Sequence, residues 1–129
     1  MTDDPAGRPL ILLVEDDRDS REMYAIGLDL FGFRVELAAT AAEALHLCAL
    51  ERPDLVVTDL TLPDMDGAAL CEALGREPAM AAVPVIVLTG RSADDDLAEA
   101  RATGVRRVIL KPCPPDALAD AIRGVLDGR

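Results

Sequence analysis

The 129-residue sequence has no apolar run long enough to cross a bilayer, and its first residues do not have the pattern expected of a secretory leader. Its start, Met1 to Arg8, includes Asp3 and Asp4, and we therefore expect it to be neither a signal peptide nor an anchor. We expect this segment to be a flexible tail and residues 9–129 to form one domain, because a chain of this length can bury one complete core. No repeat, linker or second domain is expected, and the predicted location is cytoplasmic.

Positive charge, cysteine and histidine are also scarce. The formal net charge is −11, which disfavours direct binding of nucleic acid or of anionic membranes. The three cysteines lie far apart without a Cys-x-x-Cys pair, which disfavours disulfides and structural zinc and favours reduced thiols. His46, the only histidine, is expected to be structural or solvated. The excess of acidic residues either serves solubility alone or includes some residues that cluster to bind a cation. The positions of the acidic residues in the sequence distinguish these two interpretations.

Half of the residues are hydrophobic, and short β-rich runs alternate with longer helical ones. Strands are predicted at Leu10–Val14, Arg34–Ala38, Asp54–Thr58, Val85–Leu88 and Val108–Leu110. Helices are predicted at Arg18–Phe31, Thr40–Leu50, Leu70–Gly75, Ser92–Gly104 and Asp116–Leu126, with a loop at Pro63–Gly67. The second strand is the most polar and is expected at a sheet edge. Strict alternation predicts an α/β fold with a doubly wound, five-stranded parallel sheet and five helices on its two sides.

Side chains with useful chemistry follow four of the five predicted strands. Glu15 and Asp16 follow the first strand, Asp59 the third, Thr89 the fourth and Lys111 the fifth. In open parallel sheets, ligands bind at the carboxyl ends of the strands, where the strand order reverses. We therefore expect three carboxylates, a hydroxyl and an ammonium group to converge at one rim of the sheet. Asp17, by contrast, is expected only to cap the first helix.

Such a group of acids predicts a metal-assisted reaction. Neighbouring carboxylates repel and are driven toward the neutral form unless a cation shares the site. Oxygen-only donors favour a hard ion, Mg²⁺ first and Mn²⁺ as a substitute. A carboxylate can attack phosphorus to form an acyl phosphate, while the ion and Lys111 neutralise charge on the transferred group. The sequence thus predicts Mg²⁺-dependent phosphoryl transfer to Asp59.

Four motifs together resemble those of response-regulator receiver domains of two-component systems. They are Val14-Glu15-Asp16-Asp17, Asp59-Leu60-Thr61-Leu62-Pro63-Asp64-Met65-Asp66-Gly67, Val87-Leu88-Thr89-Gly90 and Lys111-Pro112. The resemblance covers about Pro9 to Leu126 and implies a CheY-like, flavodoxin-like sheet of order 2-1-3-4-5 with five helices. It implies phosphorylation by a sensor histidine kinase or a histidine phosphotransfer protein. It also implies a switch that catalyses only its own phosphorylation and dephosphorylation, and is otherwise no enzyme.

The resemblance also implies a role for each site residue. Asp59 corresponds to the phospho-acceptor. Metal binding is implied for Asp59 and for three further groups, namely Asp16 directly, Glu15 through water and the backbone carbonyl of Thr61. Thr89 corresponds to the switch hydroxyl that turns toward the phosphoryl group, and Lys111 to the ammonium that contacts it. The Lys111–Pro112 peptide bond is expected to be cis.

The chain departs from the family pattern at two positions. At the position of Val108, receivers commonly carry an aromatic residue whose side chain flips as the switch threonine moves. At the position of Cys113, they often carry a phenylalanine. The acceptor chemistry needs neither group. The two departures affect the surface formed by the last two helices and the last strand, which in receivers transmits the signal to a partner. A weak homodimer through the same surface is a further interpretation.

The sequence favours a stand-alone phosphorylated switch that signals to an unknown downstream protein over three other functions. A receiver-like scaffold could bind a partner without phosphorylation, but it would be expected to have lost some of the five site residues. Aspartyl-phosphate phosphatases place a second Asp where this chain has Thr61. A dinucleotide-binding fold requires a Gly-x-Gly-x-x-Gly motif after the first strand, which is absent. The sequence is also compatible with a fragment of a longer regulator.

Overall fold

The structure is a computed structural model that describes residues 7–90, 98 and 104–128. Its strands are β1 (Leu10–Val14), β2 (Arg34–Ala38), β3 (Leu55–Thr58), β4 (Val85–Thr89) and β5 (Arg107–Leu110). They pair in parallel in the order β2-β1-β3-β4-β5. The α/β class, the parallel sheet and the implied strand order are therefore confirmed.

The described part of the chain contains four helices, α1 (Arg18–Leu30), α2 (Ala41–Leu50), α3 (Gly67–Arg76) and α5 (Pro115–Asp127). Five helices were expected, and the one predicted at Ser92–Gly104 lies mostly outside the described residues. Of the tail expected at residues 1–8, only Gly7 and Arg8 are described, and Arg8 pairs with Asp29 at 3.2 Å. No helix among the described residues is both long and apolar enough to span a membrane.

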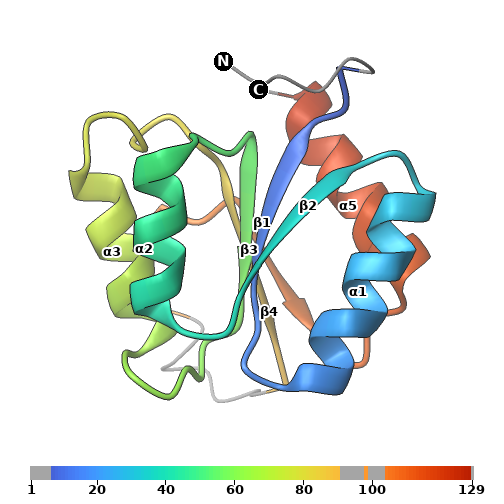
Figure 1. Ribbon diagram of the computed structural model, residues 1–129, viewed down its shortest axis with the longest axis horizontal. Coiled ribbons are helices and arrows are strands. Elements are labelled where there is room, and N and C mark those ends of the chain that lie inside the picture. The colour runs from blue at the N-terminus through green and yellow to red at the C-terminus, as the bar shows by residue number, and fades with distance from the viewer. Residues whose placement is uncertain (1–6, 91–97, 99–103, 129) are drawn as a thin grey trace.

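The sheet is covered on both faces, with α2 and α3 on one side and α1 and α5 on the other (Figure 1). Successive residues of a strand point to opposite faces. Accordingly, Leu12 and Val14 of β1 pack in the cluster under α2 and α3, whereas Ile11 and Leu13 pack in the cluster under α1 and α5. Burial of each such side chain contributes about 1.5–3 kcal/mol. This double burial explains why β1 is a continuous apolar run.

Polarity along the strands follows their place in the sheet. β1, β3 and β4 occupy the interior and are buried at every residue. β2 lies at an edge, as its polar sequence predicts, and its residues Arg34, Val35 and Glu36 are only partly buried. β5 forms the opposite edge and is exposed or partly buried throughout.

Helix starts are set by side-chain caps. Asp17 accepts a hydrogen bond from the Ser20 amide at 2.9 Å and so caps α1, as expected. Asp66 accepts from the Ala68 amide at 2.8 Å and starts α3 at Gly67. The prediction that this helix begins near Leu70, after a loop at Pro63–Gly67, was therefore wrong, because it relied on large apolar residues and overlooked the cap.

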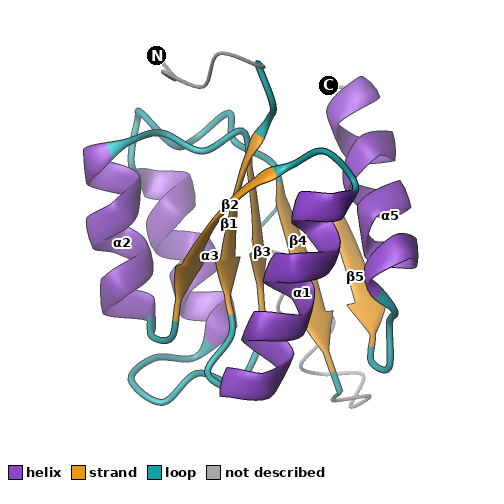
Figure 2. Cartoon of the chain, turned by 45° about the vertical axis from the view of Figure 1, so that its right-hand side comes forward, coloured by secondary structure: helices purple, strands orange, loops and turns teal. Residues whose placement is uncertain are grey.

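The carboxyl ends of all five strands face the same end of the molecule (Figure 2). β1 lies between β2 and β3, so the loops after β1 and β3 leave the sheet side by side. β4 runs one residue further than predicted, to Thr89. The Lys111–Pro112 bond that follows β5 is cis, as the family resemblance implies.

Candidate functional site

Three carboxylates meet at this end of the sheet. Val14 of β1 pairs with Thr58 of β3, so the residues that follow them, Glu15, Asp16 and Asp59, lie together. One oxygen of each lies within 4.8 Å of one oxygen of the others. Glu15 is buried, Asp59 is partly buried and Asp16 is exposed. Solvent can therefore reach the cluster from one side, while the strand ends enclose the other.

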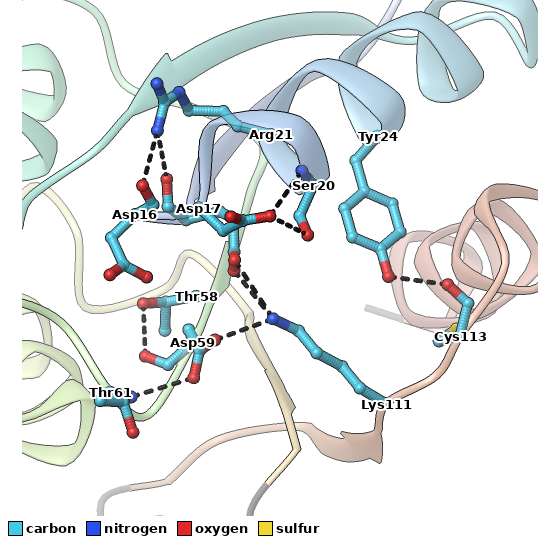
Figure 3. A network of polar contacts seen from close by, with 11 residues as sticks. Asp16, Asp17, Ser20, Arg21, Tyr24, Thr58, Asp59, Thr61, Lys111 and Cys113 are labelled. Atoms are coloured by element: carbon cyan, nitrogen blue, oxygen red, sulfur yellow. Dashed lines mark hydrogen bonds and ion pairs between the residues drawn. The ribbon is translucent and has the colours of Figure 1, made fainter.

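Lys111, the only lysine of the chain, links two of these acids (Figure 3). Its Nζ lies 2.9 Å from Oδ2 of Asp59 and 3.2 and 3.1 Å from the two oxygens of Glu15. Its backbone amide donates to the Thr89 carbonyl at 2.8 Å, which continues the β4–β5 pairing. One ammonium group thus contacts two of the three clustered carboxylates, and the ends of β1, β3 and β5 bring these side chains together.

The pKa values of the ion pair reflect its partial burial. Burial raises the pKa of the Glu15 carboxyl, and the nearby ammonium of Lys111 offsets this only in part. For Lys111, burial acts to lower the pKa, but the hydrogen bonds and charges of Asp59 and Glu15 together outweigh it and raise the pKa. The ammonium therefore remains charged at neutral pH, and the buried carboxylate of Glu15 is stabilised by this cation beside it.

The loop between β3 and α3 orients Asp59. The Thr61 amide donates to Oδ1 of Asp59 at 2.9 Å, while Lys111 holds Oδ2. Farther along, the Gly67 amide donates to the Leu60 carbonyl at 2.8 Å and folds the loop back on itself. Among the described residues, each oxygen of the Asp59 carboxylate therefore accepts from one donor, and these two contacts set the direction in which the group faces.

The remaining candidates fall as follows. Thr89 ends β4 at the same rim and is fully buried. Thr61 is exposed and joins the cluster through its backbone amide. Val108, at the position of the family's usual aromatic residue, is partly buried against the α2–α3 cluster. His46 is exposed, as expected for a solvated residue.

Two residues of α1 contribute contacts that sequence reasoning missed. Nη1 of Arg21 donates to the backbone carbonyls of Glu15 and Asp16, at 2.9 and 3.2 Å. The buried hydroxyl of Tyr24 donates to the Cys113 carbonyl at 2.7 Å and ties α1 to the segment after Lys111. Both partners are backbone atoms, so no residue type or spacing in the sequence could have indicated them.

The Lys111→Ala substitution is expected to lower the free energy of unfolding by about 3 kcal/mol, the lower end of what removing one partner of a buried ion pair costs. It leaves buried Glu15 and Asp59 without their shared cation. Because the folded pKa of Lys111 lies above its ordinary value of 10.5, this contribution is full at lower pH and disappears as the pH rises through the raised value.

Chemical denaturation of both proteins at neutral pH and at strongly alkaline pH measures this difference. Arg18→Ala is the control, because the Arg18–Glu22 pair is exposed on α1 and such pairs contribute little. A loss for Lys111→Ala no larger than that of the control would contradict the role of the ion pair.

The donor set fits a hard divalent cation. All three clustered side chains offer oxygen only, as Mg²⁺ and Mn²⁺ prefer. Within the described part of the chain, the ammonium group of Lys111 is the only cation in an ion pair with these side chains, so one of their three charges is balanced and the cluster stays anionic. An added divalent ion would relieve the repulsion that remains.

Comparisons with known proteins agree with this geometry. Residues 11–123 match the family described as the response regulator receiver domain. The transcriptional regulatory protein AfsQ1 of Streptomyces coelicolor is 36% identical over 118 residues, which are 92% of this chain and 51% of that protein. The chain thus spans about half the length of the curated relatives it matches.

Solved structures show the same likeness. The signal receiver domain of a histidine kinase from Syntrophus aciditrophicus superposes with a TM-score of 0.86 and 35% identity, covering 93% of this chain and 91% of that one. The chemotaxis response regulator CheY4 of Vibrio cholerae has a TM-score of 0.86 and 27% identity, covering 92% and 98%. With the family match over most of its length, this chain belongs to the response regulator receiver domains of two-component systems.

Proposed function

We propose that this receiver accepts a phosphoryl group on Asp59 from a sensor histidine kinase or a histidine phosphotransfer protein, with Mg²⁺ in the acidic cluster. Glu15, Asp16, Asp59 and the backbone carbonyl of Thr61 would hold the ion, Asp16 directly and Glu15 through water. The observation that supports the proposal most strongly is the approach of three carboxylate oxygens to within 4.8 Å, two of the groups sharing Lys111.

In the proposed reaction, an oxygen of Asp59 attacks the phosphorus atom. The new O–P bond forms as the bond from phosphorus to the donor's histidine nitrogen breaks, and the imidazole keeps the electron pair and takes up a proton. The Thr61 amide and Lys111 hold the carboxylate in one orientation, which reduces the entropy lost on reaching the transition state. Bound Mg²⁺ would neutralise charge on the phosphoryl oxygens.

After transfer, Lys111 and Thr89 are proposed to carry the signal. The ammonium group of Lys111 would contact the new phosphoryl oxygens, and the Thr89 hydroxyl would turn toward them. Because Val108 stands at the usual aromatic position, its smaller side chain moves little surface, so the output relies more on backbone rearrangement near the end of β4.

The proposed unit is a receiver at residues 9–129 after a tail at residues 1–8, located in the cytoplasm and signalling through protein contacts. The direct test incubates the intact chain with Mg²⁺ and a small acyl phosphate and measures its mass. We expect the gain of one phosphoryl group with Mg²⁺ and none when the ion is chelated. No gain under either condition would leave a phosphorylation-independent interaction scaffold as the better account.

Asp16→Asn is expected to have opposite effects on stability with and without Mg²⁺. Without the ion, losing one of three repelling charges should raise the free energy of unfolding by about 1 kcal/mol, since Asp16 is exposed and its interactions are screened. For the wild type, Mg²⁺ at about a hundred times its dissociation constant should add about 2.7 kcal/mol. The variant should lose most of that gain, as measured by thermal unfolding with and without Mg²⁺.

Asp19→Asn is the matched control, because it makes the same change in the first turn of α1, beyond the cluster. Its Mg²⁺ response should equal that of the wild type. An equal Mg²⁺ response in the Asp16 variant would remove that residue from the proposed metal site.

A further inference from the structure

The amino terminus of α2 is capped by two side chains, one of which comes from a distant loop. Thr40 precedes the helix and accepts from the Glu43 amide at 3.1 Å. Asp64, in the β3–α3 loop, accepts from the amides of Ala41 and Ala42 at 2.9 and 3.0 Å, one with each oxygen. These backbone hydrogen bonds lower the pKa of the Asp64 carboxyl, so the group is ionised at neutral pH.

The same loop carries the residues that surround the phospho-acceptor. Asp64 lies at its tip, between Thr61 and Asp66, which form an antiparallel bridge across the loop. Thr61 in turn donates its amide to Oδ1 of Asp59. Leu60 and Leu62 anchor the start of the loop in the core, whereas Asp64 attaches its exposed tip to a helix on the same face of the sheet.

We propose that Asp64 is a positioning residue for the metal site, which it serves by holding the loop tip on α2 and thereby fixing the backbone of Thr61. This inference rests on the proposed function, in which the Thr61 carbonyl is a metal ligand. A side-chain ligand can adjust its rotamer, but a backbone carbonyl is placed only by the segment that carries it. Substitution of residues behind a metal ligand typically weakens metal binding by about 10–100-fold.

The competing explanation is that Asp64 only stabilises α2, and Thr40 provides the control that separates the two. Thr40→Ala removes a cap from the same helix terminus but leaves the contact between the loop and the helix. Asp64→Ala removes both a cap and that contact. If Asp64 acts only on the helix, the two variants should affect the metal site equally.

The experiment titrates the intact chain with Mg²⁺ alone, followed by the change in amide resonances. Salt at about 1 M, where the Debye length is about 3 Å, suppresses the direct effect of the lost charge. Asp64→Ala should weaken binding about tenfold, and Thr40→Ala by less than about twofold. Binding by Asp64→Ala within about twofold of the wild type, or equal weakening by both variants, would overturn the proposal.

A second readout needs no metal. Amide hydrogen exchange at Thr61 should be faster in Asp64→Ala than in the wild type, because the tip no longer supports its hydrogen bond to Asp59. In Thr40→Ala, exchange should increase at Glu43 and stay unchanged at Thr61. Unchanged exchange at Thr61 in Asp64→Ala would contradict the positioning role.

Two further comparisons keep the outcome clear. Asp64→Asn retains the shape of the side chain and one oxygen acceptor. It should therefore bind Mg²⁺ with an affinity between those of the wild type and Asp64→Ala. An affinity equal to that of the wild type would count against the positioning role of Asp64. If the wild type fails to bind Mg²⁺ at all, the proposed function itself fails. If the wild type binds and the Asp64 variants match it, only the role of Asp64 is lost.

Discussion

Replacing Asp59 with asparagine is expected to abolish phosphoryl uptake from a small acyl phosphate in the presence of Mg²⁺. An amide is a poor nucleophile and cannot form an acyl phosphate, whereas the carboxylate of Asp59 has both oxygens oriented by donors. Neither Glu15, which is buried and bonded through both oxygens to Lys111, nor exposed Asp16 is held in the same way. We therefore expect no other acid of the cluster to substitute.

Intact-mass measurement tests this expectation, and treatment with hydroxylamine, which cleaves acyl phosphates but not phosphate esters, identifies the linkage. Asp66→Asn is the matched control, because it makes the same substitution in the same loop and asparagine caps helices as well as aspartate does. The control should gain one phosphoryl group as the wild type does. A hydroxylamine-sensitive mass gain in the Asp59 variant would show that another carboxylate is the acceptor.

Gly67→Ala is expected to destabilise the fold by about 3 kcal/mol, the upper end of the usual cost of overpacking. A Cβ atom at Gly67 would lie 2.3 Å from the Asp59 carbonyl oxygen and 2.6 Å from the Cα atom of Leu60. Both are backbone atoms of the segment that follows β3, so no side-chain rotation can relieve the clash. The loop would have to move, and the acceptor with it.

Gly75→Ala provides the matched control in the same helix. A Cβ atom there meets nothing within 4 Å, so alanine should stabilise α3 by about 0.5–1 kcal/mol through its better helix propensity. Urea unfolding of the three proteins gives both differences, and phosphoryl uptake should be lowered only in the Gly67 variant. A Gly67→Ala protein as stable as the wild type would show that the loop yields easily and that the close contact matters little.

The prediction of the fold from sequence succeeded where the pattern was strongest. Leu10–Val14, a run of five apolar residues, predicts a strand buried on both faces, and it forms an interior strand of the sheet, between β2 and β3. The predicted start of α3 was wrong by three residues, because Gly67 and Ala68 carry little apolar signal and the helix start is marked instead by the cap at Asp66. The strand order came from the family resemblance, since periodicity within a strand does not determine which strands become neighbours.

For the candidate site, the sequence predicted which side chains lie together but not all of the contacts that hold them. Placing reactive side chains at strand ends brought Glu15, Asp59 and Lys111 together correctly. The contacts of Arg21 and Asp64 were not predicted, because each side chain binds backbone atoms of another segment. Any residue can supply a backbone partner, so such contacts leave no signature in the sequence.

By itself, the sequence determined which chemical groups follow each strand, because hydrophobic runs set the strands and the next residue in the chain must emerge at the strand end. Only the tertiary structure decided which of those groups touch. In the folded chain β1 pairs with β3, between two hydrophobic clusters, and this long-range pairing brings Asp16 to Asp59 and Lys111 between Glu15 and Asp59. The repulsion that favours a bound cation therefore arises from folding, between residues more than forty positions apart.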